Sequence, residues 1–362
     1  MSEQICVSVI VPVYNAENHI KTCLEVLLKQ DFRKSFEIIM IDDASSDNTR
    51  NIIKMCKFPR LRLYSLTSNS GPSAARNVGI KNAKGEYVFF IDVDDTIAEN
   101  TLTTLYSIAN QTDCDFVFSD FKRIEDSRNQ RNNTYNFPTD KFFGDNELIE
   151  GMRRELYDPN LGHLGLFGCH GRLIRRSIIS DNNIFFQEEL RFFEDKTFCW
   201  DIFGFVHSAR YVRKQLYSYS VQPNVCTASV EGLNRGFYIK HFKLIRNQMK
   251  NSMKQRGLAA KEIEKHGDQG FIFIIITALV SYSRSMALGK VNLEEGVQCR
   301  RKIIVDIIAD PDVSKAIRNY LPSKKESPWI PKAIAWRSRR LLEFACNRRA
   351  KEVVRIRREG KA

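Results

Sequence analysis

Three aspartates stand within four residues of this 362-residue chain, at Asp92, Asp94 and Asp95. They follow an apolar run, Tyr87 to Ile91, whose length and residue types predict a buried strand. Three carboxylates this close repel one another unless a cation lies between them, and hard oxygen ligands suit Mg²⁺ or Mn²⁺. Alternation along a strand places Asp92 and Asp94 on the same side, which favours them as the pair. Asp95 precedes a helical pattern, and a helix cap is an equally good interpretation for it.

A second acidic pair, Asp42 and Asp43, follows another apolar run. A carboxylate at the end of such a strand can accept hydrogen bonds from a pyrimidine N–H or from ribose hydroxyls, and a nearby Tyr14 can stack on a base. An Asx turn before Ser45 and Ser46 is the structural alternative. The two interpretations are compatible if each applies to a different aspartate.

The segment GPSAARN predicts the start of a helix, because Pro72 suits the first helical turn. Arg76 lies one turn further on, where it can reach an anionic ligand or hold the aspartate cluster. The chain has neither GxGxxG nor GxxxxGK[ST], so dinucleotide and P-loop sites lose their main support.

Alternating periodicities in the first 120 residues indicate the elements that position these side chains. We predict strands at 7–13, 36–41, 61–66 and 87–91, and helices at 17–29, from about 52, and at 71–85. This βαβαβαβ order predicts an α/β fold with a Rossmann-like, mostly parallel sheet, helices on both faces and a ligand site at the carboxyl ends of the strands. The polar residues that follow the strands should meet there: Pro12, Tyr14, Asn15, Glu17, Asp42, Asp43, Asn69, Gly71, Asp92, Asp94 and Asp95.

The rest of the chain has a different pattern. Residues 121–145 are polar and aperiodic, which predicts a connecting loop, and residues 235–320 are helical in pattern. The longest apolar run, Phe271 to Val280, is about half of the ~20 residues that span a bilayer, so we expect a buried helix there and no transmembrane helix.

Composition limits the class of protein. The hydrophobic fraction of 43% and the charged fraction of 27% are typical of a soluble globular chain. The nine cysteines are scattered and lack CxxC spacing, and the N-terminus lacks the pattern of a secretory signal, so we expect reduced core cysteines in a cytoplasmic protein. The net charge of +13 favours contact with phosphates, on nucleotides, nucleic acid or an anionic membrane.

Most of the excess charge lies in residues 328–362, where eleven Lys or Arg and three Glu give +8. On a helical wheel, apolar residues including Ile334, Leu342 and Cys346 share one side and arginines share another. This pattern predicts a basic amphipathic helix on an anionic membrane surface, with Trp336 and Phe344 as interfacial anchors. The alternative is a solvated helix packed on the domain.

Three segments, in order and correctly spaced, carry a family resemblance: VSVIVPVYNAENHIKTCLEVLLKQ, FEIIMIDDASSDNT and NSGPSAARNVGIKNAKGEYVFFIDVDD. They resemble the nucleotide-sugar-binding domain of family 2 glycosyltransferases, which are inverting enzymes of the GT-A fold. The resemblance implies that Asp92-Val93-Asp94 is the DxD motif, with Asp94 on Mn²⁺ or Mg²⁺ and Asp92 on ribose or metal. It also implies a donor site lined by Pro12, Tyr14, Glu17, Asp43 and Arg76.

A weaker resemblance covers GRLIRRSIISDNNIFFQEELRFFEDKTF, which is similar to the family's region that supplies the general base. It implies that Asp195, with Glu194 as second candidate, deprotonates the acceptor hydroxyl. A plain helix-start acidic pair is the alternative. The chain departs from the family at His170, where many relatives have Trp, and at Val221 and Gln222, where relatives often have an Arg for the diphosphate. Arg213 or Lys214 could replace that Arg, although an exposed charge is the simpler interpretation.

These observations predict a GT-A domain at residues 1–230, a helical C-terminal region at 231–327 and a basic tail at 328–362. The expected activity is that of an inverting hexosyltransferase, which moves a sugar from a nucleotide sugar of UDP type to a glycan or lipid-linked acceptor in surface polysaccharide or lipopolysaccharide assembly. The expected location is the inner face of the cell membrane. The alternatives are a nucleotidyltransferase and a non-catalytic binding subunit; nucleic-acid binding is not expected, because the predicted cleft is acidic.

Overall fold

The computed structural model describes residues 4–124, 130–133, 137, 139–157, 168–190, 192–220, 233, 236, 238–322 and 326–358. The chain divides into two compact units. The first comprises Met1–Gly151, Leu164–Glu188 and Glu194–Pro223, and the second comprises Met152–His163, Glu189–Phe193 and Asn224–Ala362. The domain boundaries expected at residues 230 and 327 stay predictions.

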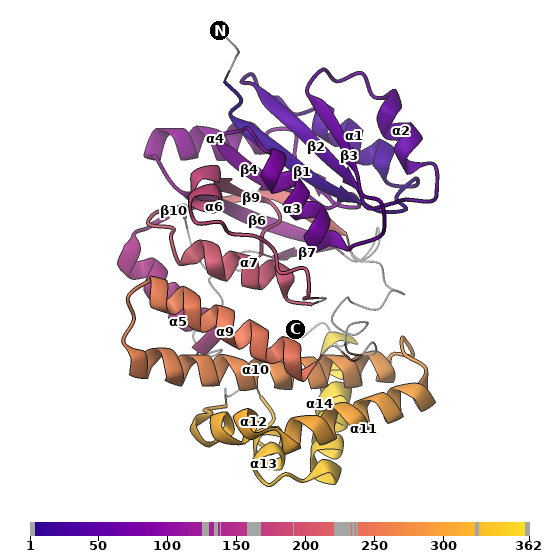
Figure 1. The fold of residues 1–362 in the computed structure, drawn as a ribbon, viewed down its shortest axis with the longest axis vertical. Coiled ribbons are helices and arrows are strands. Elements are labelled where there is room, and N and C mark those ends of the chain that lie inside the picture. The colour runs from indigo at the N-terminus through magenta and orange to yellow at the C-terminus, as the bar shows by residue number, and fades with distance from the viewer. Residues whose placement is uncertain are drawn as a thin grey trace. The chain divides into compact units, whose positions relative to one another are not determined.

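The first unit is built on a ten-stranded sheet (Figure 1). Its strands are β1 (Val7–Val13), β2 (Phe36–Asp42), β3 (Leu61–Ser65), β4 (Tyr87–Phe90), β5 (Thr96–Ile97), β6 (Phe116–Ile124), β7 (Gln130–Asn133), β8 (Lys141–Phe143), β9 (Arg172–Arg175) and β10 (Ala209–Ser220). Its helices are α1 (Ile20–Leu28), α2 (Thr49–Met55), α3 (Pro72–Asn82), α4 (Thr101–Thr112), α6 (Arg176–Asp181) and α7 (Glu194–Phe203), and α5 (Asp145–Tyr157) contains the boundary between the units.

The strand order is β3-β2-β1-β4-β9-β6-β10-β5. The pairs β3–β2, β2–β1, β1–β4 and β6–β10 are parallel, whereas β9 runs antiparallel to both β4 and β6. Connections between the first four strands pass through helices, as parallel pairing requires. The expected α/β fold and the parallel pairing of the first four strands are therefore confirmed, whereas the sheet as a whole is mixed because β5, β7, β8 and β9 pair antiparallel.

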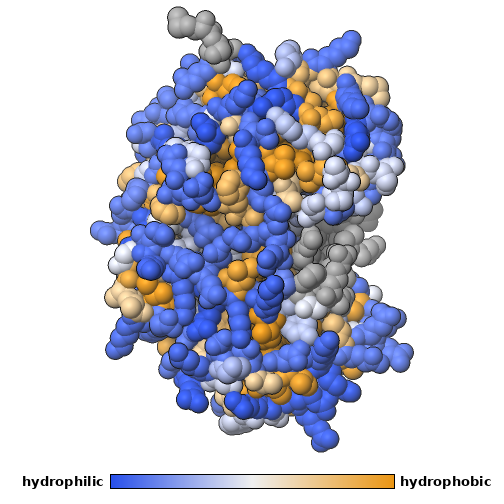
Figure 2. Space-filling view, in the orientation of Figure 1, coloured by the Kyte–Doolittle hydropathy of each residue, from blue (hydrophilic) through white to orange (hydrophobic). Residues whose placement is uncertain are grey.

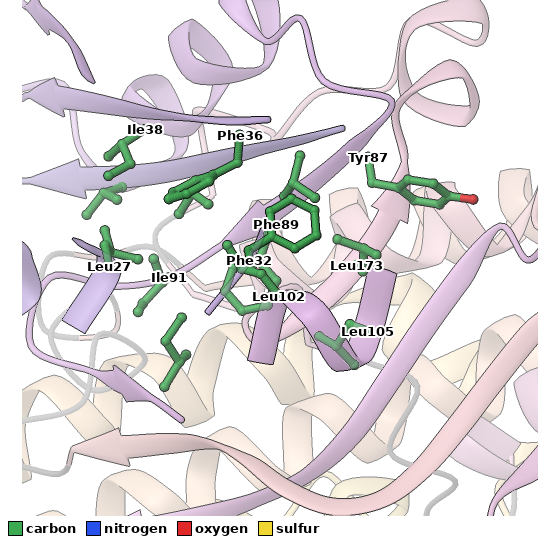
Figure 3. Close-up of a cluster of buried hydrophobic side chains, with 14 of the residues drawn as sticks. Leu27, Phe32, Phe36, Ile38, Tyr87, Phe89, Ile91, Leu102, Leu105 and Leu173 are labelled. Atoms are coloured by element: carbon green, nitrogen blue, oxygen red, sulfur yellow. The ribbon is translucent and has the colours of Figure 1, made fainter. Parts of the chain in front are cut away.

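Both faces of the sheet are buried: every residue of β1, β2 and β4 is buried, and most of them are apolar. Odd-numbered residues of β1, such as Val9 and Val11, pack with Leu27 of α1 and Leu105 of α4 in one core (Figure 3). On the opposite face, Gly79 of α3 lies so close to the sheet that an added Cβ would stand 2.4 Å from Cγ2 of Ile10. Helices therefore pack on both faces of the sheet and hold its strands in place.

The second unit is helical within its described residues. Its helices are α9 (Ile239–Gln255), α10 (Ala260–Ala287), α11 (Leu293–Ala309), α12 (Pro311–Ala316), α13 (Trp329–Ala335) and α14 (Arg339–Arg358), with a 3₁₀ turn at Ile317–Asn319. α10 carries the expected buried run and is long and apolar enough to cross a membrane, but 67% of its apolar window is buried inside the structure, as in the core helix of a folded domain. An ion pair between Arg246 and Asp268 joins α9 to α10.

The structure differs from two expectations. Residues 121–145 contain the end of β6 and the strands β7 and β8 rather than a loop only, because polar strands at the margin of a sheet lack an apolar alternation. The basic tail is not one helix: the chain turns at Arg337, whose φ is +51°, between α13 and α14. Leu342 and Cys346 of its apolar side are fully buried, so this side belongs to the core of the second unit, in agreement with the packed-helix alternative.

Several aromatic and basic side chains between residues 328 and 358 are exposed to solvent. Trp329, Trp336 and Phe344 are exposed, and Arg340, Arg348, Lys351 and Arg355 are exposed on α14. On the face drawn in Figure 2, hydrophilic residues cover most of the surface and hydrophobic ones form separate patches. The described cysteines, which exclude Cys226, are free thiols, as expected, and most are buried.

Candidate donor site

Two loops at the carboxyl edge of the sheet are joined by hydrogen bonds. The loop after β1 contains Asn15, whose amide donates to Ser45 Oγ at 2.9 Å and whose Oδ1 accepts from the Ser46 amide at 2.9 Å. Further along the same two loops, the Glu17 amide donates to Asp47 Oδ2 at 3.0 Å. The carboxyl ends of β1 and β2 therefore form one continuous rim.

Three of the expected donor-site residues lie along this rim. Pro12 is buried within β1, opposite Ile41 of β2. Tyr14 directly follows the strand and is 49% exposed, so its ring is open to solvent and available for stacking. Glu17 is exposed, and its Oε2 accepts from the Asn48 amide at 3.1 Å.

Asp42 and Asp43 have different environments. Asp42 accepts from the Ser45 amide at 3.2 Å and from Nη2 of Arg50 at 2.6 Å, so it makes the expected Asx turn and a salt bridge. Asp43 accepts from the amides of Ser70 and Gly71 at 2.7 and 2.8 Å. Asp43 thus anchors the loop that leads into α3, and each of its oxygens retains a second lone pair for a ligand.

Asp92 lies against two basic side chains. Its Oδ1 is 2.8 Å from Nη2 of Arg76, and its Oδ2 is 3.2 Å from Nε2 of His170. The same Nη2 and Nε2 are 3.0 Å apart, so the three groups form a closed triangle. The expectation from the residues that Arg76 can hold the aspartate cluster is confirmed, and His170 is a further partner.

The attraction of the Asp92 carboxylate to its two basic partners dominates the pKa values in this triangle. Burial alone would raise the pKa of Asp92, but the charges and hydrogen bonds of His170 and Arg76 hold that pKa far below its ordinary value. Burial likewise opposes the charged form of His170, yet Asp92 raises the pKa of the imidazole well above its ordinary value. Asp92 is therefore ionised at neutral pH, and its charge favours the protonated form of His170.

Arg76 is itself buried, with 3% of its surface exposed. Its guanidinium lies 5.3 Å from the ring centre of Phe186, and its Nη1 is 3.8 Å from Oε1 of Glu194. Within the described residues, Nε and Nη1 have no hydrogen-bond partner. A buried guanidinium with two unsatisfied nitrogens is unusual and is suited to an anionic ligand.

Asp94 and Asp95 differ from Asp92. Asp94 is partly exposed and has no ion pair among the described residues, and burial together with the charge of Asp92 raises its pKa. Asp95 is buried; it accepts from the Tyr217 hydroxyl and, at 2.8 Å, from the Ser220 amide. Burial and Asp92 raise the pKa of Asp95 to about 7. The helix-cap interpretation of Asp95 is wrong, because the chain continues into β5 and α4 begins only at Thr101.

Glu194 and Asp195 form the first turn of α7. Oδ1 of Asp195 accepts from the Lys196 amide at 2.8 Å, as a helix-start acid does. Glu194 lies closer to the triangle through Arg76, and burial and the negative charge of Asp195 raise its pKa. The structure thus brings Arg76, Asp92 and Glu194 together within one unit, with Asp195 beside them in sequence.

Sequence reasoning missed the residues that support Arg76. Asn77 binds both the amide and the carbonyl of Phe186, and Phe186 stacks on Phe198 with ring centres 3.9 Å apart. Tyr217, which holds Asp95, was also missed. The pairing of these residues depends on contacts distant in sequence, and no local pattern marks it.

Comparison with known sequences decides the family. The profile described as "Glycosyl transferase family 2" matches residues 8–182, which include β1 to β4, β9 and the Arg76–Asp92–His170 triangle. Residues 8–182 form a glycosyl transferase family 2 domain.

Several bacterial relatives of this chain are similar over at least half of it. It is 33% identical over 201 residues to "Glycosyltransferase GlyG" of Streptococcus pneumoniae, with 54% of this chain and 64% of the relative aligned. It is 30% identical to the "Poly(ribitol-phosphate) beta-N-acetylglucosaminyltransferase TarS" of Staphylococcus aureus, of which 31% is aligned. It is 28% identical to "Uncharacterized glycosyltransferase YibD" of Escherichia coli, with 86% and 87% aligned. The chain thus spans less than two thirds of the first two relatives.

Solved structures confirm the fold of this chain. The crystal structure of S. aureus TarS 1–349 in complex with UDP-GlcNAc matches it with a TM-score of 0.69 and 23% identity, over 96% of this chain and 92% of that one. The match covers the helical C-terminal region as well as the sheet. The expected GT-A fold followed by a helical region is therefore confirmed.

Divalent metals are common in the GT-A fold, and the site residues bear on whether one fits here. Among the described residues, no group of three or more His, Cys, Asp and Glu side chains is placed to hold a metal ion. Within the same described part of the chain, Asp94 offers one partly exposed carboxylate that makes no ion pair. Such a donor fits an Mg²⁺ or Mn²⁺ ion that takes its other ligands from substrate phosphates and water.

The remaining predicted positions are less informative. Arg213 and Lys214 are exposed on β10, in agreement with the simpler interpretation of two surface charges. Val221 and Gln222 lie outside the described residues.

Proposed function

We propose that this protein is an inverting glycosyltransferase, which moves a hexose from a nucleotide sugar to an acceptor hydroxyl. The observation that carries the proposal is the Arg76–Asp92–Glu194 cluster at the carboxyl end of β4, of which Arg76 and Asp92 lie within the residues that match family 2. Sugar transfer from a nucleotide sugar needs a cationic group near the diphosphate and a carboxylate near the attacking hydroxyl, and this cluster offers both kinds of group.

The donor in this proposal is a UDP-sugar. Relatives support it, since TarS has been crystallised with UDP and with UDP-GlcNAc. In this chain, Tyr14 is available to stack on the base, Asp43 to accept from the ring N–H, and Pro12 and Glu17 to line the base and ribose. Arg76 supports base and phosphate with its unsatisfied nitrogens.

Asp94 would hold a Mn²⁺ or Mg²⁺ ion, with Asp92 as the second candidate ligand. When bound, such an ion neutralises charge on the departing nucleoside diphosphate. Asp94 contributes an uncompensated carboxylate, whereas Asp92 is already paired with Arg76 and His170.

Asp195 is the proposed general base, with Glu194 as the second candidate. The base must lie within hydrogen-bond reach of the attacking hydroxyl and be ionised at the working pH. Glu194 lies 3.8 Å from Arg76, which suits a role in orienting that guanidinium, while its raised pKa is the property that keeps it as the second candidate for the base. The attack occurs opposite the leaving diphosphate, so the anomeric configuration inverts.

The proposed acceptor is a glycan or lipid-linked hydroxyl in the assembly of a surface polysaccharide or lipopolysaccharide, at the cytoplasmic face of the membrane. The exposed residues Arg340, Arg348, Lys351 and Arg355 form one basic face of α14, because they recur at helical spacing. Phe344 lies on the same face. This basic face is suited to anionic headgroups, and the aromatic ring to the interfacial region.

The test of the proposed activity is release of UDP from a panel of UDP-sugars, with membrane lipid extracts as acceptors. We expect release that depends on one sugar and on the extract, and that falls at least a hundredfold in Asp195→Asn. No release with any UDP-, GDP- or dTDP-sugar would contradict the proposal.

A further inference from the structure

The contact between Arg76 and Asp92 is less complete than such contacts usually are. Arginine–carboxylate pairs are frequently bidentate, with two parallel N–H···O bonds. Here only Nη2 of Arg76 meets Asp92, through Oδ1 at 2.8 Å. The second oxygen, Oδ2, lies 3.2 Å from Nε2 of His170. His170 therefore occupies the oxygen that would otherwise complete the pair.

Arg76 consequently keeps N–H groups that are not bonded to Asp92, one of which a bidentate pair would use. Its Nε and Nη1 are buried and have no hydrogen-bond partner in the described part of the chain, and the nearest carboxylate oxygen recorded for Nη1 is that of Glu194 at 3.8 Å. Leaving buried donors unsatisfied is costly unless a ligand completes them. Arg76 is 3% exposed and its guanidinium lies over the ring of Phe186, so it cannot simply turn to water.

The backbone fixes His170 beside Asp92. An isolated bridge pairs His170 with Phe90 at the end of β4, and the Gly171 amide donates to the Phe90 carbonyl at 3.1 Å. Gly171 has a φ of +66°, and an added Cβ there would stand 2.7 Å from the ring of Tyr217. Asp92 follows Phe90 by two residues, so the same strand end places both members of the pair.

We propose that His170 is a positioning residue of the donor site. By binding Oδ2 of Asp92, it prevents a bidentate Arg76–Asp92 pair and leaves Nε and Nη1 of Arg76 for the anionic diphosphate of the donor. The inference rests on the proposed function, because it assumes a nucleoside diphosphate at this site.

Binding of UDP and of uridine, measured by calorimetry at saturating Mn²⁺, separates positioning from mere structure. In His170→Phe we expect Asp92 to close on Arg76, so that UDP binds at least tenfold more weakly while uridine, which has no phosphate, binds within twofold of wild type. In His170→Gln, whose side-chain amide can still donate to Asp92, UDP affinity should stay within threefold. In Asp92→Asn, the additional His170→Phe substitution should change UDP affinity less than twofold, because the carboxylate that captures Arg76 is gone.

A matched control is His207→Phe, which removes an exposed histidine 3.0 Å from Asp145 and should leave UDP affinity unchanged. Unchanged UDP binding in His170→Phe, an equal loss of UDP and uridine, or failure of Gln to preserve affinity would each overturn the inference. His170→Leu serves as the apolar variant if the Phe variant does not fold. If wild type binds UDP but these differences are absent, only this inference fails; if wild type binds no nucleotide, the proposed function fails with it.

Discussion

Asn77 binds the main chain of Phe186 with both ends of its side-chain amide. Its Nδ2 donates to the Phe186 carbonyl at 2.9 Å, and its Oδ1 accepts from the Phe186 amide at 2.8 Å. The same Nδ2 is 2.9 Å from Oε1 of Glu188. The ring of Phe186 lies against the guanidinium of Arg76. This pair of hydrogen bonds therefore connects α3 to the residues that support the donor site.

Asn77→Ala should therefore lower both stability and donor binding. Removing the amide leaves a buried carbonyl and a buried N–H of Phe186 without partners, which costs about 2–4 kcal/mol of unfolding free energy. Chemical denaturation measures this loss, and UDP calorimetry should show weaker binding at temperatures where the variant is folded. Asn82→Ala, which removes a local bond to Val78 in the last turn of α3, is the control and should cost less than about 1 kcal/mol. Equal losses would argue against a special role of Asn77.

Asp195→Asn and Glu194→Gln should separate the two base candidates. Loss of a general base lowers kcat by about 10² to 10⁴, while loss of a group that orients Arg76 acts on donor affinity. We expect the large kcat effect in Asp195→Asn and a change mainly in KM for the donor in Glu194→Gln. Steady-state kinetics on the two amide variants, which preserve side-chain size, measure both constants. The reverse pattern would transfer the base role to Glu194.

Asp95 should make stability depend on pH between about 4 and 7. Its folded pKa of about 7 lies above the ordinary value of 3.8, so the folded state binds the proton more tightly than the unfolded state. In this window the unfolding free energy must fall as pH rises, by at most about 1.4 kcal/mol per pH unit from this group.

Asp95→Asn removes this titration, and its amide can still accept from the Ser220 N–H through Oδ1 while its NH2 donates to the Tyr217 hydroxyl. The variant should therefore lose less stability than wild type between pH 5 and pH 7. Urea denaturation at several pH values gives the two slopes. Parallel slopes would show that Asp95 is ionised in the folded state throughout.

The basic face of α14 should bind anionic membranes. Arg340→Glu with Arg348→Glu changes the charge of that face by −4 and should reduce sedimentation with vesicles containing phosphatidylglycerol at least tenfold, since each basic residue near such a surface contributes about 1 kcal/mol. The controls are phosphatidylcholine vesicles and the Lys261→Glu variant. Lys261 is an exposed residue near the start of α10, distant in sequence from α14. Binding that is independent of both charge and lipid would contradict membrane association through α14.

Much of the sheet was predictable because its signals are local. Residues 7–13 form β1 as expected, and β2, β3 and β4 each differ from the prediction by one residue at the carboxyl end. The insertion of β9 between β4 and β6 was not predictable, since strand order depends on pairing between distant segments. For the same reason the sequence could place Asp92 after a strand but not show that His170 lies beside Arg76, 94 residues away.

The tail shows where a helical wheel misleads. Its periodicity correctly predicts an apolar side and a basic side, but the same periodicity is produced by a helix that packs on its own domain. The turn at Arg337 and burial of Leu342 and Cys346 decide between the two, and both depend on tertiary structure. Only the exposed residues of α14 remain available to a partner.

The most direct test of the donor site is calorimetric binding of UDP, GDP and dTDP, with and without Mn²⁺, to wild type and to Asp94→Ala. We predict that UDP binds most tightly, that Mn²⁺ strengthens this binding at least tenfold, and that Asp94→Ala abolishes the Mn²⁺ effect while its thermal unfolding stays close to that of wild type. Nucleotide binding that is absent, or equally strong without Mn²⁺ and in Asp94→Ala, would contradict a metal-assisted UDP-sugar site at the end of β4.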